Sequence, residues 1–285
     1  MIRSLSFYPG CSLEGTARDY RKSIEKAFRH LGISLEELEN WTCCGASAAH
    51  SLDRELAFRL SAFNLVIAEK AGRDLLVPCA LCFHNLKSAE KKILGSEDLA
   101  KHYGYSGSIR VYDIASFLAL PEVLEKIRRL VTRPIKGLRA VCYYGCLTAR
   151  PPSITDCPEP ENPSSLERVL SVLEAEPVEW PQKTDCCGAG HAVPRPELVE
   201  TLVKHLYDAA VAWGADCIVV SCQMCQANLD MFQENLTRKS ALSHPIPVLY
   251  VTELINLASG EKEEADFKGH FVDPSPLISR IFSGR

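Results

Sequence analysis

Ten of the thirteen cysteines in this chain of 285 residues repeat one spacing twice. The first five follow C-x31-CC-x34-C-x2-C, and the second five follow C-x39-CC-x34-C-x2-C. Bridging adjacent cysteines forces a strained ring, so neither CC pair is a good disulfide, whereas thiolates bind metals and carry redox chemistry. The ten residues are Cys11, Cys43, Cys44, Cys79 and Cys82 in the first motif, and Cys146, Cys186, Cys187, Cys222 and Cys225 in the second.

The composition also disfavours a disulfide framework. The cysteine count is odd, and 46% hydrophobic residues are enough to bury a core without covalent cross-links. The N-terminus MIRSLSFYPGCS lacks the regions of a signal peptide, and no run of about 18 apolar residues occurs. We therefore expect a cytoplasmic protein without direct membrane insertion. A net charge of -4 gives no support for a nucleic-acid partner.

Each motif offers one ligand more than common metal sites use. A structural zinc or a cubane 4Fe-4S cluster takes four ligands, and each motif has five cysteines. A thioredoxin-like dithiol at CALC (79–82) or CQMC (222–225) would leave three cysteines of each motif without a role. A multi-iron cluster uses all five if one sulfur of the CC pair bridges irons. All three possibilities stay open on ligand count, and the cluster is our hypothesis.

The flanks of the two motifs also match. FYPGC corresponds to CYYGC, LLVPCALCFHNL to IVVSCQMCQANL, and VYDIASFL to LYVTELIN, at a period of 135 to 143 residues. That period is too long for a solenoid repeat and indicates an internal duplication. We predict two homologous, pseudo-two-fold related α/β lobes at residues 1–136 and 137–258, followed by a tail at 259–285 that is a possible subunit-docking segment.

Local patterns predict the elements that position the motifs. Short apolar runs at residues 4–8, 74–78, 139–144 and 217–221 fit buried strands, and each ends just before a motif cysteine. Cofactors in open α/β sheets sit beyond the carboxyl ends of strands, so the cysteines are expected to converge there. Amphipathic helices are expected at 18–32 and 51–72. The predicted buried faces are Tyr20, Ile24, Ala27, Phe28 and Leu31 in the first helix, and Leu56, Leu60, Phe63 and Ile67 in the second.

Other residues near the motifs receive weaker interpretations. A glycine after each CC pair would let backbone approach a bulky inorganic group, although an ordinary turn glycine explains it equally well. His50 and His191 could donate protons to departing thiolates, but ordinary polar or surface roles are favoured. Cys142 and Cys217 lie in apolar runs and Cys157 in a proline-rich loop, so all three are interpreted as non-ligands.

The doubled pattern C-x(31 to 39)-CCG-x(33 or 34)-C-x-x-C, with the stretches ENPSSLERVL and FNLVIAEKAG, resembles the CCG repeats in the B-type subunit of heterodisulfide reductase. The resemblance covers residues 1 to about 258. It implies one noncubane 4Fe-4S cluster on each set of five cysteines, with the two clusters facing one another across the lobe interface. No motif position is missing in either set.

The resemblance further implies an oxidoreductase that acts on a sulfur group. The family reduces a disulfide, here a small-molecule substrate, with electrons from an iron-sulfur C-type subunit that carries cubane clusters and is served by a flavin-containing A-type subunit. The alternative is a related electron-transfer subunit of a quinone-linked fumarate or succinate enzyme, or of a sulfur-oxidising complex, with no disulfide substrate of its own.

Overall fold

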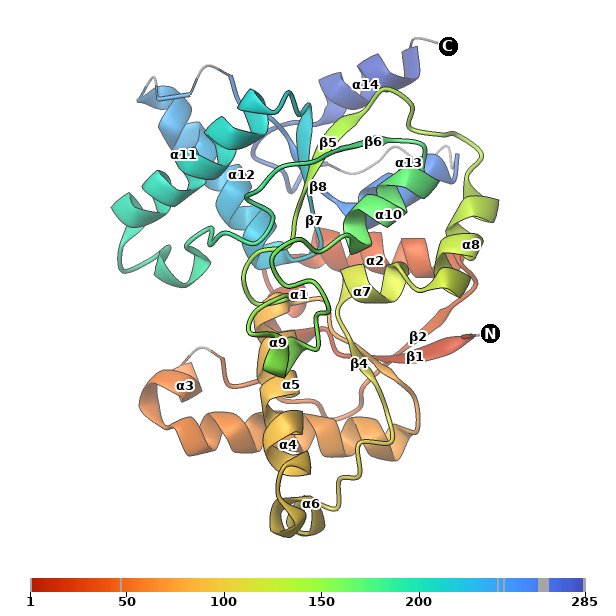
Figure 1. Cartoon of the computed structure of the whole chain (residues 1–285), viewed down its shortest axis with the longest axis vertical. Helices are drawn as coiled ribbons and strands as arrows, with labels where there is room; N and C mark the ends of the chain where they lie inside the picture. The colour runs from red at the N-terminus through yellow and green to blue at the C-terminus, as the bar shows by residue number, and fades with distance from the viewer. Residues whose placement is uncertain (1, 47, 240, 243, 261–266, 284–285) are drawn as a thin grey trace.

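Two parallel four-stranded sheets form the framework of the molecule. The structure is a computed structural model that describes residues 2–46, 48–239, 241–242, 244–260 and 267–283. The first sheet has the order β2-β1-β3-β4 and the second β6-β5-β7-β8, and every pairing is parallel. Figure 1 shows the first sheet in its lower half and the second in its upper half. The strands are β1 Ser4–Phe7, β2 Ser34–Glu37, β3 Leu75–Leu76, β4 Val111–Tyr112, β5 Arg139–Tyr143, β6 Glu176–Val178, β7 Cys217–Val220 and β8 Val248–Tyr250.

All four predicted strands are present, as β1, β3, β5 and β7. They are the central strands of the two sheets, and their buried apolar residues explain why the sequence signals them. The other four strands were not predicted. Edge strand β2, with the sequence SLEE, is mostly exposed and has no apolar run to detect. The α/β class is therefore confirmed, while the duplication stays a prediction.

The helices cover the faces of the sheets and follow the strands in chain order. They are α1 Gly10–Glu14, α2 Arg18–His30, α3 Ala48–Leu52, α4 Arg54–Ala71, α5 Ala80–Leu94, α6 Glu97–Tyr103, α7 Ile114–Leu118, α8 Pro121–Leu130, α9 Pro152–Thr155, α10 Ser165–Val172, α11 Pro196–Ala212, α12 Gln223–Arg238, α13 Val251–Ala258 and α14 Ser275–Ser283, with a short 3-10 turn, η1, at Ala189–His191. Among the described residues, no helix is long and apolar enough to span a bilayer.

One of the two predicted helical faces is wrong. In α2 the expected residues Tyr20, Ile24, Ala27 and Phe28 are buried. In α4 the opposite happens, because Leu56 and Phe63 are 44% and 42% exposed, and Leu60 and Ile67 are only partly buried. The buried side of α4 consists of small and polar residues that let the helix pack closely against α5. These residues are Ala57, Ser61, Ala62, Asn64, Leu65 and Ala68.

The two sheets are joined by reciprocal helix contacts. Helix α2, which follows β1, packs against α13, which follows β8, while α10 after β5 packs against α7 after β4. At the first contact the rings of Tyr20 and Tyr250 stack with centroids 3.9 Å apart, and the Ser23 and Thr252 hydroxyls are 2.8 Å apart. A main hydrophobic core includes buried residues from both sheets. The reciprocity is what a pseudo-two-fold arrangement requires.

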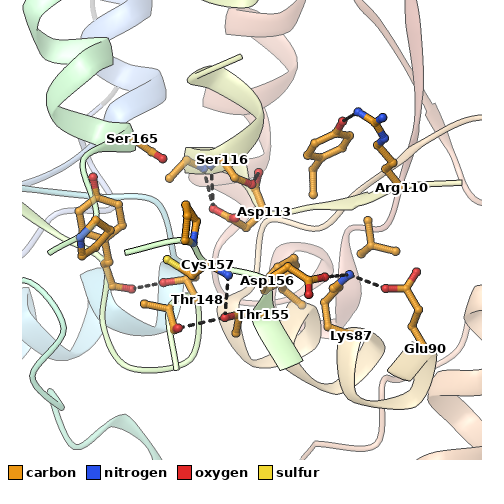
Figure 2. Close-up of a pocket in the computed structure, with 18 of the residues that line it drawn as sticks. Lys87, Glu90, Arg110, Asp113, Ser116, Thr148, Thr155, Asp156, Cys157 and Ser165 are labelled. Carbon is orange, nitrogen blue, oxygen red and sulfur yellow. Dashed lines mark hydrogen bonds and ion pairs between the residues drawn. The ribbon is translucent and has the colours of Figure 1, made fainter. Parts of the chain in front are cut away.

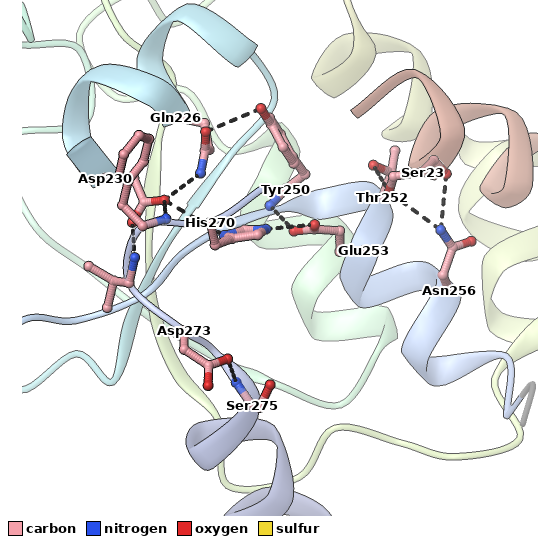
Figure 3. A network of polar contacts seen from close by, with 12 residues as sticks. Ser23, Gln226, Asp230, Tyr250, Thr252, Glu253, Asn256, His270, Asp273 and Ser275 are labelled. Carbon is pink, nitrogen blue, oxygen red and sulfur yellow. Dashed lines mark hydrogen bonds and ion pairs between the residues drawn. The ribbon is translucent and has the colours of Figure 1, made fainter. Parts of the chain in front are cut away.

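The end of the described chain packs on its own protein. Figure 3 shows His270 between the carboxylates of Glu253 in α13 and Asp230 in α12. Its Nε2 lies 2.9 Å from Glu253 Oε1, and Asp230 accepts the backbone N–H groups of Phe271 and Val272 at 2.8 and 3.1 Å. Leu277 and Ile278 of α14 join the main core. Residues 261–266 of the predicted tail lie outside the described residues.

The interaction of His270 with acidic residues makes the packing of residues 267–272 against α12 and α13 dependent on pH. Burial disfavours the charged imidazolium, but Glu253, Asp230 and Asp19 outweigh that effect and raise the pKa of His270. A raised folded-state pKa gives stabilisation that is complete below about pH 6.5 and is lost as pH rises through the folded-state value. We expect the protection factors of the Phe271 and Val272 amides, which compare the observed exchange with the intrinsic rate at each pH, to fall from pH 6 to pH 8.

The variant His270→Ala should remove most of the pH dependence of these protection factors and leave them low at both pH values. His102→Ala, at an exposed position on α6, is the matched control and should behave like the parent protein. An unchanged pH dependence in His270→Ala would show that another group controls the attachment.

Candidate functional site

The motif cysteines of each sheet follow the carboxyl ends of three neighbouring strands. Cys11 comes after β1, the pair Cys43 and Cys44 after β2, and Cys79 after β3. In the second sheet Cys146, the pair Cys186 and Cys187, and Cys222 follow β5, β6 and β7 in the same way. Because β2-β1-β3 and β6-β5-β7 are adjacent in their sheets, residues far apart in sequence come together at one edge.

The five sulfurs of the first motif form a continuous series of neighbours. The side chains of Cys11 and Cys43, Cys43 and Cys44, Cys44 and Cys82, and Cys82 and Cys79 each lie close enough for one thiol to influence the pKa of the other. The Sγ atoms of Cys44 and Cys82 are 3.2 Å apart. The hydrogen bond with Cys82 lowers the pKa of Cys44 to about 7 although burial opposes it. Thiolate is the form that binds metals, so Cys44 has ligand character near neutral pH.

The second motif brings its sulfurs together in two linked groups. Cys146 is hydrogen-bonded with Cys186, and Cys225 with both Cys187 and Cys222. The hydrogen bond from Cys146 lowers the pKa of Cys186 to about 6. Cys186 and Cys187 are sequence neighbours and interact electrostatically, which joins the two groups. All five sulfurs therefore lie in one neighbourhood.

The two motifs meet between the sheets at their N-capping cysteines. Cys79 occupies the N-cap position of α5 and Cys222 that of α12, and the two thiols interact closely enough for each to shift the pKa of the other. The backbone N–H of Ala80 also donates to Cys222 Sγ at 3.4 Å. Cys79 and Cys222 are only 4% and 2% exposed, whereas Cys11 and Cys186 are exposed at the other end of each set. The two sets thus share a buried contact and each has an open edge.

No three Cys, His, Asp or Glu side chains among the described residues surround a single point as ligands of one metal ion. All thirteen cysteines are free thiols. Each motif is instead an extended series of sulfurs, which suits a polynuclear group better than a single zinc ion.

Matching hydrogen bonds hold each CC turn in place, and the sequence interpretation missed the residues that make them. Tyr8 donates its hydroxyl to the carbonyl of Thr42 at 2.7 Å, and Tyr143 donates to the carbonyl of Asp185 at 2.6 Å. Both tyrosines lie three residues before the first cysteine of a motif. The signal was present in the matched flanks FYPGC and CYYGC, in which the two tyrosines are aligned.

Two asparagines complete the support of the CC pairs. Asn85 and Asn228 each lie three residues after the last motif cysteine, on α5 and α12. Asn85 donates to the carbonyl of Cys44 at 3.2 Å, and Asn228 donates to the carbonyl of Cys187. The helices that carry CxxC therefore also fix the backbone of the CC turn.

The glycines after the CC pairs lie at positive φ, +79° at Gly45 and +78° at Gly188, as turn glycines do. A Cβ on Gly45 would lie 2.7 Å from Cα of Ala57, and one on Gly188 would lie 3.0 Å from the Leu202 side chain, so both permit close packing against the next helix. The glycines that face sulfur are the ones before the first cysteines. A Cβ on Gly10 would lie 3.3 Å from Cys82 Sγ, and one on Gly145 would lie 3.0 Å from Cys225 Sγ. The free space beside the sulfurs of Cys82 and Cys225 therefore depends on Gly10 and Gly145.

The remaining candidate residues lie around this arrangement. His50 and His191 are exposed in the segments after the two CC pairs, and the charge of His191 contributes to the lowered pKa of Cys186. Cys142 and Cys217 are fully buried within β5 and β7, where burial raises the pKa of each thiol. Cys157 is partly buried in the loop after α9.

A cavity of about 360 Å³ lies beside the site, between α5, β4 and α7 on one side and the loop after β5 on the other. Figure 2 shows Lys87 between Glu90 and Asp156, with its Nζ 2.9 Å from Asp156. The proline-rich loop thus walls a cavity and is fastened to α5. The lining includes Cys157 but none of the ten motif cysteines. Its walls and the sulfur series are therefore neighbouring but separate features.

Comparison with known proteins supports the doubled motif. The family description "Cysteine-rich domain", CCG, matches residues 5–87 and 140–230. The chain is 31% identical to the 8-methylmenaquinol:fumarate reductase membrane anchor subunit of Wolinella succinogenes, covering 97% of this chain and 100% of that protein. It is 28% identical to the B-type subunit of the ferredoxin/F420H2-dependent CoB-CoM heterodisulfide reductase of Methanosarcina acetivorans, covering 99% and 98% of the two chains.

A solved structure shares the fold at low sequence identity. A hypothetical protein from Helicobacter pylori superposes with a TM-score of 0.67 at 13% identity, covering 94% of this chain. The chain spans about half, 52%, of the length of that protein.

The glycine before the second motif gives a direct test of the space beside Cys225. Gly145→Ala adds a methyl group 3.0 Å from Cys225 Sγ at φ +70°, whereas Gly137→Ala has φ +79° and no atom within 4 Å. Backbone strain should destabilise both variants by about 1 kcal/mol. Only Gly145→Ala should also lose about half of the iron bound after anaerobic reconstitution. Equal iron in the two variants would contradict a ligand role for this sulfur.

Proposed function

Because the chain belongs to the cysteine-rich CCG domain family, we propose that it is the catalytic B-type subunit of a heterodisulfide-reductase-like complex. It reduces a small-molecule disulfide to two thiols, using two noncubane 4Fe-4S clusters. The first cluster is held by Cys11, Cys43, Cys44, Cys79 and Cys82, and the second by Cys146, Cys186, Cys187, Cys222 and Cys225. The observation that carries this proposal is the two series of five neighbouring sulfurs, which meet at Cys79 and Cys222.

The donor set and its surroundings fit such a group. Each series supplies five soft thiol ligands, and lowered pKa values of Cys44 and Cys186 favour thiolate in both. Gly10 and Gly145 leave space open beside the sulfurs of Cys82 and Cys225. Backbone N–H groups of Gly45 and Gly188 lie 3.4 and 3.3 Å from the sulfurs of Cys43 and Cys186, where they stabilise negative charge.

The reaction consumes two electrons and two protons for each disulfide, and yields two thiols when the S–S bond breaks. Bound clusters supply one-electron steps and iron that binds sulfur, so neither half of the substrate leaves as a free radical. The chain holds the two sets in contact through Cys79 and Cys222, which keeps both halves within one site. Protons are available from solvent at the exposed residues Cys11 and Cys186, and the charge of His191 acts on Cys186.

We propose that electrons come from a C-type iron-sulfur subunit with cubane clusters, which receives them from a flavin-containing A-type subunit. The relative from Methanosarcina acetivorans is named as one subunit of a ferredoxin/F420H2-dependent enzyme, which supports assembly with partners. In this proposal the chain consists of two homologous lobes, at residues 1–136 and 137–258, and a C-terminal segment at residues 259–285. The described part of that last segment packs on α12, α13 and the main core.

A second candidate function is supported by the relative from Wolinella succinogenes. That protein is named as a subunit of an 8-methylmenaquinol:fumarate reductase, and it is 31% identical to this chain. In a complex of that kind the chain would relay electrons between a quinol and fumarate without a disulfide substrate. The ligand sets would be the same, so the substrate distinguishes the two functions.

The first measurement is the iron, acid-labile sulfide and zinc content of anaerobically purified protein. About eight irons and eight sulfides per chain are expected for two four-iron clusters. Cys44→Ser and Cys187→Ser should each remove or alter one cluster and leave the other largely intact. Equal loss from both sets in either variant would contradict independent sites. One or two zinc ions without sulfide would refute the redox function.

The disulfide substrate is tested by rapid mixing of the reduced protein with small disulfides. Reoxidation of the clusters together with release of two thiols per disulfide is expected. Cys11→Ser, at the exposed edge of the first set, should slow thiol release at least tenfold. Reoxidation by a menaquinone analogue or through a fumarate reductase partner, but by no disulfide, would favour the second function.

A further inference from the structure

Gln223 carries a buried amide whose two polar atoms have no hydrogen-bond partner among the described residues. The side chain belongs to a residue that is 3% exposed, and both Nε2 and Oε1 lack a partner. Buried polar groups are normally hydrogen-bonded, because a group removed from water without a new partner destabilises the fold. A side chain with both atoms orphaned therefore indicates a partner that the polypeptide itself does not provide.

Gln223 lies where the two cysteine sets meet. It is the first residue of α12 and directly follows Cys222, whose thiol interacts with that of Cys79 in the other set. The Ala80 N–H at the start of α5 donates to Cys222 Sγ at 3.4 Å, so the two helix starts face each other. The matched motifs CALC and CQMC place Ala80 at the position that corresponds to Gln223. The amide therefore has no counterpart on the first side.

The position of Gln223 on α12 directs it away from its own motif. Cys225 and Asn228 mark the side of α12 that serves the second set, because Cys225 contacts Cys187 and Asn228 donates to the Cys187 carbonyl. At about 100° per residue, Gln223 lies roughly 200° from Cys225 and roughly 140° from Asn228 around the helix axis. The buried Gln223 side chain therefore lies on the side of α12 away from Cys187, at a helix start that faces α5.

We propose that the Gln223 amide donates a hydrogen bond to the first-motif cluster at or beside Cys79. The inference rests on the proposed function, because it requires that the ten cysteines hold clusters. Hydrogen bonds to the sulfurs of a cluster stabilise the extra negative charge of the reduced state, which raises the reduction potential. Gln223 is therefore a positioning residue that makes the two chemically similar sets unequal.

This inequality gives the reaction a direction. An electron entering the chain is held preferentially on the side of Cys79, and the side of Cys222 is the weaker acceptor. A disulfide would then encounter two sides of unequal reducing power.

The test compares Gln223→Leu with the parent protein in anaerobic redox titrations followed by electron paramagnetic resonance. Leucine has a similar volume, removes both orphaned atoms and offers no donor, so the variant should fold at least as stably as the parent. Iron content should be unchanged. The potential of one cluster should fall by about 59 mV, which corresponds to a tenfold weaker acceptance of one electron. Met224→Leu, at the adjacent half-buried position, is the matched control and should shift neither potential.

The affected cluster is identified in two single-cluster backgrounds. Cys187→Ser retains the first set and Cys44→Ser retains the second, so Gln223→Leu should shift the potential only in the Cys187→Ser background. Normal iron with no shift in either background, or a shift only in the second set, would overturn the role of Gln223. Parent protein that binds no iron would overturn the proposed function itself, which separates the two failures.

Discussion

The alignment of parallel strands at one sheet edge is the constraint on which the site depends. Three adjacent strands in each sheet end together, so five cysteines distributed over some 70 to 80 positions reach one small volume without any long-range covalent link. The sequence between strands only has to return the chain to the same edge. Helices α5 and α12 each contribute to the site in two ways. Each carries CxxC at its start, and about one helical turn later each carries an asparagine that hydrogen-bonds to the backbone of the CC turn.

The contact between the two sheets is what turns two ligand sets into one site. Tyr20 reaches across it, stacking on Tyr250 and donating its hydroxyl to the Ser221 carbonyl at 2.7 Å, directly before Cys222. Polar contacts of Ser23 with Thr252 and Asn256 add specificity to an interface that is otherwise apolar. Because these bonds are directional and partly or fully buried, they fix the orientation of α2 on α13 and hence the distance between Cys79 and Cys222.

The ligand candidates and the central strands could be predicted from sequence because both leave strong local signals. A repeated cysteine spacing can be recognised in the sequence without knowledge of the fold. Buried strands such as β5 and β7 can be recognised because they are almost entirely apolar. Edge strand β2 and the inward face of α4 could not be predicted in the same way. Ser61 and Asn64 are buried because they hydrogen-bond to the CC turn, through the carbonyls of Cys44 and Thr42, and that demand is visible only in three dimensions. The roles of Gly10, Gly145 and Gln223 likewise depend on neighbours that are distant in sequence.

The strap formed by residues 267–272 has a consequence for the order of events during biosynthesis. These residues are translated after both sheets, yet they contact Asp230 and Glu253 and pass so close to Asp19 that a Cβ on Gly269 would lie 2.5 Å from its carboxylate. Until they emerge from the ribosome, α2 is held against α13 without this outer fastening. The complete set of polar contacts around α12 and α13 therefore forms only after residue 272 has left the ribosome.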